Sequence, residues 1–215
     1  MKSSIFPFIC LSLVACSPAA EGDPLGETSA SAEMSSGTAG DGPFGFGMGM
    51  PISEVDGATR MENPTQYRVS SPPKSHPDIE FVILEAYPET GICAIRGIGY
   101  DIAADGSGST VRSKVDQLAS ALESKYGSQE KIDICTSGDI ACASEYWMMT
   151  MSQGERAYAY IWDKPSEAMQ KAALSNITLA ARASSIATSY LVLEFYSDET
   201  ASCETAQNAS SAASL

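Results

Sequence analysis

The chain of 215 residues has little positive charge and only one histidine, His76. Its 13 Lys and Arg residues face 27 Asp and Glu residues, which gives a formal net charge of −14. Binding to nucleic acid or to an anionic membrane surface requires an excess of Lys and Arg, so the composition argues against both. A single histidine also excludes metal sites that use several histidines and mechanisms that use a histidine pair.

No apolar run reaches the roughly 20 residues that a membrane-spanning helix needs. The run over residues 5–15 follows Lys2, and this arrangement is typical of a secretory signal peptide. Its end, Leu13-Val14-Ala15-Cys16, resembles the lipobox of bacterial lipoproteins. The resemblance implies cleavage of residues 1–15, diacylglycerol on Cys16 and a further acyl chain such as palmitate, so that a lipid anchor binds the membrane. An ordinary signal peptide with an unrelated cysteine is the alternative.

The residue after Cys16 bears on the location of the lipoprotein. Ser17 stands where an Asp would resemble the signal that retains lipoproteins in the inner membrane. We therefore expect the chain in the bacterial outer membrane, facing the periplasm, with the inner membrane and surface exposure as open alternatives.

The composition changes after residue 43. Residues 17–43 contain five acidic residues, no Lys or Arg and few large apolar side chains, so we expect 16–43 to be a disordered, lipidated tether. Such a coil spans roughly 30 Å at about 5–6 Å × √n. A single folded domain is expected over 44–200, with halves at 44–105 and 106–200, followed by a flexible tail over 201–215.

Four cysteines remain after removal of the signal: Cys93, Cys135, Cys142 and Cys203. In an exported chain, four cysteines indicate two disulfides, for which three pairings exist. The six residues between Cys135 and Cys142 suit a local bridge, which leaves Cys93 to pair with Cys203. A structural zinc site is disfavoured because the chain has no CxxC spacing and no second histidine.

The hydropathy pattern predicts an α+β fold in which helices pack on one face of antiparallel sheet, arranged as two αβββ-like halves. An apolar stripe with helical spacing predicts a helix from about Thr110 to Tyr126. Alternating glycines and large apolar residues over Phe44–Met50 indicate a segment that fills the core, with an exposed docking edge as the alternative. Strands are expected at 66–69, 79–87, 92–102, 145–152, 156–162, 176–184 and 190–196.

No motif for catalysis or cofactor binding is present. Serine does not occur in a GxSxG elbow, and His76 lies beside Asp78 in a proline-rich loop. The segment that begins at Asp101 lacks the acidic residue at position three of a calcium loop and has Arg112 in place of the glutamate at position twelve. No phosphate-binding loop occurs. We therefore predict no catalytic residue, no metal site and no cofactor. A secreted hydrolase that uses carboxylates or His76 is the alternative.

Three aromatic residues share one face of the strand expected at 156–162. Tyr158, Tyr160 and Trp162 alternate with Ala157, Ala159 and Ile161. If the small side chains face the helix, the aromatic row forms a surface for a protein partner. If the aromatic residues face the helix, they belong to the core.

The start of the domain offers a family resemblance. Gly49, Met50 and Val55 resemble the "G-M-x-x-x-x-V" segment of small outer-membrane lipoproteins, such as the accessory lipoprotein of the β-barrel assembly machinery, and of the related β-lactamase-inhibitor-protein fold. This resemblance implies a non-enzymatic binding or assembly function with a protein partner in the envelope. An inhibitor of an exported enzyme is a further alternative.

Overall fold

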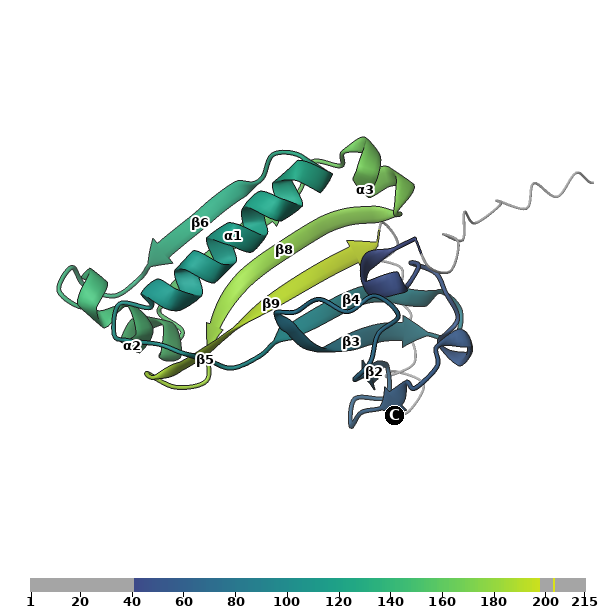
Figure 1. Cartoon of the computed structure of the whole chain (residues 1–215), viewed down its shortest axis with the longest axis horizontal. Coiled ribbons are helices and arrows are strands. Elements are labelled where there is room, and N and C mark those ends of the chain that lie inside the picture. The colour runs from purple at the N-terminus through teal and green to yellow at the C-terminus, as the bar shows by residue number, and fades with distance from the viewer. Residues whose placement is uncertain (1–40, 198–202, 204–215) are drawn as a thin grey trace, which may run out of the picture. The chain divides into compact units, whose positions relative to one another are not determined.

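The computed structural model describes residues 41–197 and Cys203. These residues form an α+β fold, a nine-stranded antiparallel sheet with three α-helices packed against it (Figure 1). Within these residues no helix combines the length and the apolar character needed to cross a membrane. The predicted signal peptide, Cys16, almost all of the tether and most of the tail lie outside the described residues and stay predictions.

The helices and strands have the following bounds. The strands are β1 (Thr59–Arg60), β2 (Gln66–Val69), β3 (Ile79–Tyr87), β4 (Gly91–Gly99), β5 (Ile102–Ala103), β6 (Glu130–Cys135), β7 (Arg156–Trp162), β8 (Leu174–Ala183) and β9 (Thr188–Ser197). The α-helices are α1 (Ser109–Tyr126), α2 (Trp147–Ser152) and α3 (Glu167–Lys171). Three short 3-10 turns are η1 (Pro43–Gly45), η2 (Ile52–Glu54) and η3 (Ser144–Tyr146).

The sheet consists of two antiparallel runs joined side by side. The strand order is β1-β2-β3-β4-β9-β8-β7-β6, and the short β5 pairs with β9 outside this path. The junction between the runs is the β4–β9 pair, in which Ile95 lies opposite Phe195. The two halves proposed from the sequence thus share one continuous sheet. The first run is preceded by the 3-10 turn η2 rather than by an α-helix.

One face of the sheet carries the core. In β9, Leu191, Leu193 and Phe195 alternate with less buried residues and point toward the helix layer. The Phe195 ring contacts Tyr126 of α1 and also Phe44, with ring centroids 6.2 and 6.0 Å away. The segment around Phe44 therefore covers the same face as α1, beside β4 (Figure 1), which confirms its prediction as a core segment.

A close approach to the sheet makes room for Phe44. A Cβ at Gly97 of β4 would lie 2.7 Å from the Phe44 ring, so only glycine admits the ring at this point. The segment is also held by the main chain, because Gly49 donates to Ile92 and Ile92 donates to Met50.

Residues 145–152 differ from the sequence prediction. They form η3 and α2 instead of a strand. The run Trp147-Met148-Met149 is apolar without alternation, and such a run fits a strand or a buried helix equally well. The helix prevails because Trp147, Met148 and Met151 then fall on one buried side.

Candidate functional site

The aromatic row of β7 packs against α1 and is buried. Tyr158, Tyr160 and Trp162 are 3%, 8% and 1% exposed, which corrects the interpretation of this row as a partner surface. The orientation is favourable because each polar tip finds an acceptor at the helix. Both tyrosine hydroxyls donate to Asp116 Oδ1, at 2.6 and 2.7 Å, and Trp162 Nε1 donates to the Gly127 carbonyl at 2.8 Å.

Asp116 of α1 also accepts from Lys131 Nζ of β6 at 3.3 Å, in a groove of about 580 Å³ between α1 and β6. Burial opposes ionisation of Asp116, but Tyr158, Tyr160 and Lys131 outweigh it and lower the pKa of the carboxyl below its ordinary value. Burial likewise opposes protonation of Lys131, yet its bonds with Tyr158, Tyr160 and Asp116 raise its pKa above the ordinary value for lysine. Burial and the bond to Asp116 raise the pKa of Tyr158 to about 12. Both groups are therefore charged near neutral pH, and their bonds hold α1 against β6 and β7.

The four cysteines form the two disulfides expected from their spacing. Cys135 is joined to Cys142 across a Cα–Cα distance of 5.8 Å. Cys93 is joined to Cys203 across 6.5 Å, and both of these cysteines are buried beside Tyr87. The first disulfide closes the loop between β6 and α2, and the second ties a residue near the C-terminus to β4.

Arg156 positions the loop that Cys135 and Cys142 close, hereafter the disulfide loop (residues 135–142). Its side chain is only 8% exposed and donates to three elements. Nη2 reaches the Cys142 carbonyl at 2.7 Å, Nη1 reaches Asp133 of β6 at 2.9 Å, and Nε reaches Thr150 of α2 at 3.1 Å. A disulfide and a buried guanidinium thus hold this loop, so its shape is set before any partner arrives.

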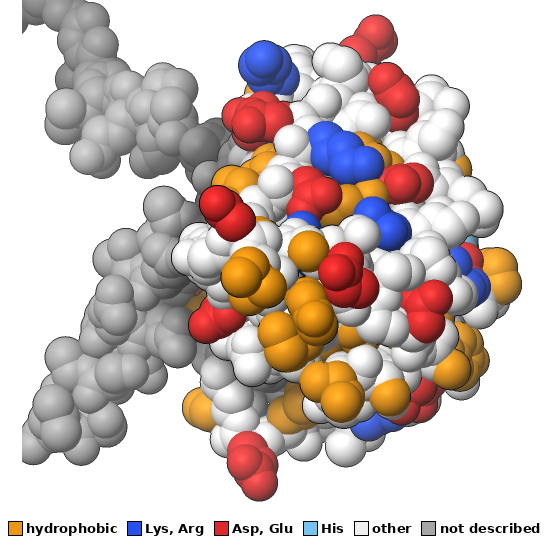
Figure 2. Space-filling model, turned by 90° about the vertical axis from the view of Figure 1, so that its left-hand side faces the viewer, with side chains coloured by type: hydrophobic (Ala, Val, Ile, Leu, Met, Phe, Trp, Pro, Cys, Tyr) orange, Lys and Arg blue, Asp and Glu red, His pale blue; other side chains and the backbone are white. Residues whose placement is uncertain are grey.

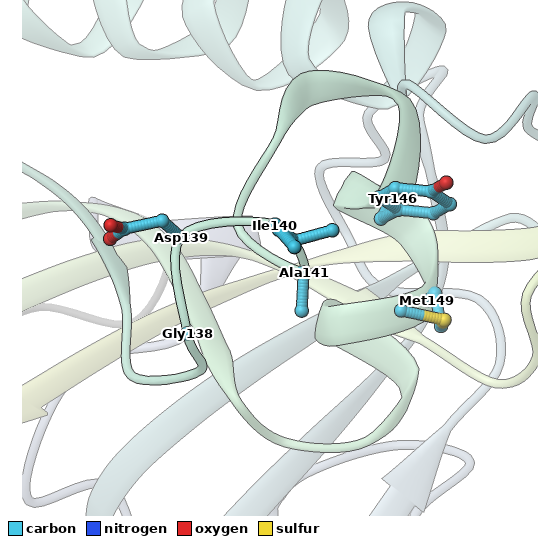
Figure 3. A pocket seen from close by; sticks show the side chains of 6 residues that line it. All are labelled: Gly138, Asp139, Ile140, Ala141, Tyr146 and Met149. Carbon is cyan, nitrogen blue, oxygen red and sulfur yellow. The ribbon is translucent and has the colours of Figure 1, made fainter.

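The disulfide loop and the turn η3 that follows it present apolar side chains to solvent. Ile140 is 83% exposed and Tyr146 is 41% exposed. Together with Ala141 and Met149 they line a hollow of about 570 Å³. Figure 3 shows that Ile140 points from the loop toward Tyr146 and Met149, whereas Asp139 points away. A large apolar side chain on a rigid loop is the kind of group that anchors protein interfaces.

Acidic residues flank the apolar cluster. Asp139 precedes Ile140, Glu145 precedes Tyr146, and both acidic residues are exposed. Figure 2 views this end of the domain and shows hydrophobic side chains gathered at the surface with acidic side chains among them. The electrostatic complement of this surface is an apolar socket with Lys or Arg at its rim.

The side chains of His76 and Asp78, the pair that the sequence set side by side, make separate contacts. His76 Nδ1 accepts the main-chain N–H of Asp78 at 3.2 Å, which is a turn contact, and the Asp78 carboxylate pairs with Lys114 at 2.6 Å. In the part of the chain that the structure describes, no group of three or more His, Cys, Asp or Glu residues is placed to hold a metal ion.

Comparisons with protein-family models, with curated proteins and with solved structures find no match for the chain. The fold defines the class: an α+β protein built on one antiparallel sheet, with one disulfide that closes a local loop and one that links distant parts of the chain. The sequence analysis singled out the cysteines of this site but missed Ile140 and Arg156. An isolated isoleucine in the polar sequence between two cysteines was the available signal for Ile140.

Proposed function

We propose that the chain is a lipid-anchored envelope protein whose domain binds another envelope protein through the disulfide loop. The observation that carries this proposal is the exposure of Ile140 on a loop held by a disulfide and by Arg156. Preformed loops lose little conformational entropy on binding, and a central aliphatic anchor supplies much of the binding free energy. The exposed Asp139 and Glu145 favour a partner surface that is apolar at its centre and basic at its rim.

Photo-crosslinking in intact bacterial cells tests the binding surface. A photoreactive amino acid at Ile140 is compared with the same group at Ile186, which is 65% exposed in the turn between β8 and β9. We expect a discrete adduct with a second protein from position 140 that position 186 does not give. Replacing Cys135 and Cys142 by alanine should remove this adduct. Equal adducts at both positions, or none at position 140, would contradict the proposed docking surface.

Metabolic labelling with radioactive palmitate tests the anchor. The lipobox predicts that labelling is lost in the Cys16→Ala variant and retained in the Cys10→Ala variant, because residue 10 leaves with the signal peptide. Unchanged labelling after Cys16→Ala would refute the anchor without affecting the docking surface.

A further inference from the structure

Strand β6 forms one edge of the sheet (Figure 1). Among the residues that the structure describes, its strand partner is β7, from Glu130 opposite Ile161 to Cys135 opposite Arg156. The same register continues to Thr136, whose N–H donates to the Glu155 carbonyl at 2.8 Å. Because main-chain groups alternate in direction along an antiparallel strand, the N–H and C=O groups of the even-numbered residues of β6 point to β7. The N–H and C=O groups of Lys131 and Asp133 therefore point outward from the sheet.

The side chains of these two residues carry opposite charges on the helix side of the sheet. Lys131 lies opposite Tyr160 and Asp133 lies opposite Tyr158, so both share the face that α1 covers. Helix α1 packs over β7, β8 and β9, which leaves the groove beside β6 open. Lys131 and Asp133 are 45% and 40% exposed there. On the opposite face of β6, Ile134 is 55% exposed.

We propose that β6 pairs with β6 of a second copy of this chain, antiparallel and centred on Ile132. In this register Lys131 of each copy lies opposite Asp133 of the other, and the two outward-facing residues exchange main-chain hydrogen bonds. Ile132 then meets its own symmetry mate. Exposed edge strands commonly add another strand, and a two-fold axis makes the same surface serve both copies.

The charges select this register over its neighbours. Moving the centre to Asp133 places two aspartates opposite each other, and moving it to Lys131 places two lysines opposite each other. Like charges directly opposite in a sheet are destabilising, whereas opposite charges are stabilising. Charged edge residues often prevent pairing altogether. Here the order Lys131-Ile132-Asp133 is self-complementary in one antiparallel register, so a second copy is the occupant that fits.

Cysteine crosslinking of the full chain in bacterial cells tests the pairing. In the Ile132→Cys variant the two thiols face each other in a non-hydrogen-bonded pair, where side chains are closest. We expect at least about tenfold more covalent dimer than from Ile186→Cys, a control at a more exposed position, because only the facing pair meets disulfide geometry. Maleimide labelling measures access to each thiol. No excess of dimer from position 132 overturns the proposal, whether its thiol is labelled or covered by something else.

Charge reversal tests the register. In the Ile132→Cys background, Lys131→Glu should reduce the crosslinked dimer to the level of the control, because it sets Glu opposite Asp133 twice. Asp133→Lys should do the same by setting Lys opposite Lys131. Coexpression of the two variants with different tags should restore a mixed dimer, since both facing pairs are then complementary.

The coexpressed pair also controls for folding. Asp133 bonds to Arg156 and Lys131 bonds to Asp116, so each charge reversal removes one bond within the domain and can disturb it. A crosslink that Lys131→Glu leaves unchanged overturns the register. Folded single variants that fail to form the mixed dimer also overturn it. Restoration of the mixed dimer excludes unfolding as the reason for the earlier loss.

Discussion

The guanidinium Nη2 of Arg156 lies 2.7 Å from the main-chain carbonyl oxygen of Cys142 and donates to it. This bond joins the start of β7 to the end of the disulfide loop, and it forms where the arginine side chain is only 8% exposed. A buried charged donor with three acceptors stabilises the loop and is costly to remove.

Arg156→Met should therefore destabilise the domain. Its removal leaves the acceptors on Asp133, Thr150 and Cys142 without their donor, and we expect a loss of about 2–4 kcal/mol in the free energy of unfolding. Arg182→Met, on the exposed side of β8, is the control and should change stability by no more than about 0.5 kcal/mol. Urea denaturation measures both. Equal stability of the two variants would show that Arg156 does not hold the loop.

The two disulfides should contribute unequally. Replacing Cys93 and Cys203 by alanine opens a loop with a sequence separation of 110, and replacing Cys135 and Cys142 opens one of 7. The loop-closure entropy of the unfolded chain predicts losses of roughly 4–5 and 2–3 kcal/mol. Thermal and urea unfolding of the two double variants give the order. A larger loss from the short loop would show that the loop-closure entropy of the unfolded chain does not dominate the stability that the disulfides contribute.

Acid should weaken the contact between α1 and β7. The pKa of Asp116 is lowered in the folded state, so its charged form contributes stability above its unfolded value, about 3.9. That stability is lost as the pH falls through the folded value. Unfolding measured from pH 6 to pH 2 should show a shallower acid decline for Asp116→Asn than for the parent. Asp56→Asn, in an exposed turn, should follow the parent curve.

Gly108 should tolerate no side chain. Its φ is +61°, and a Cβ there would lie 2.2 Å from the Trp147 ring. Gly57 has a similar φ of +71°, but a Cβ there would meet nothing within 4 Å. Backbone strain alone should cost about 1–2 kcal/mol in Gly57→Ala, whereas Gly108→Ala adds the clash and should cost about 3 kcal/mol or more. Differential scanning calorimetry of the pair separates the two effects.

The sequence predicted the elements whose pattern has one clear period. Helix α1 was expected because its apolar stripe is continuous, and β7 was expected because large and small residues alternate. The sequence of β7 left open which of its two faces, the aromatic or the Ala-rich one, packs against the helix. The choice depends on Asp116, which lies 42 residues before Tyr158 in the chain and whose position no local pattern reveals.

The remaining differences have a similar origin. Strand β6 was not predicted because only two apolar residues, Ile132 and Ile134, alternate in it. The face toward the helix side carries Lys131 and Asp133 instead, and the open groove keeps them in water. The disulfide loop could be located from Cys135 and Cys142, but the exposure of Ile140 depends on how the loop packs beside α2 and β6. Local sequence sets where the loop begins and ends, whereas Arg156, which bonds to the Cys142 carbonyl, comes from a strand that follows the loop in the chain.

The Cys93–Cys203 disulfide also determines how the chain carries mechanical load. A pull on the two ends of the chain passes through this covalent bond, so residues 94–202 are bypassed and bear no tension. The bypassed segment includes α1, the disulfide loop and β6. Single-molecule stretching should therefore extend only residues before 93 and after 203 until the bond is reduced.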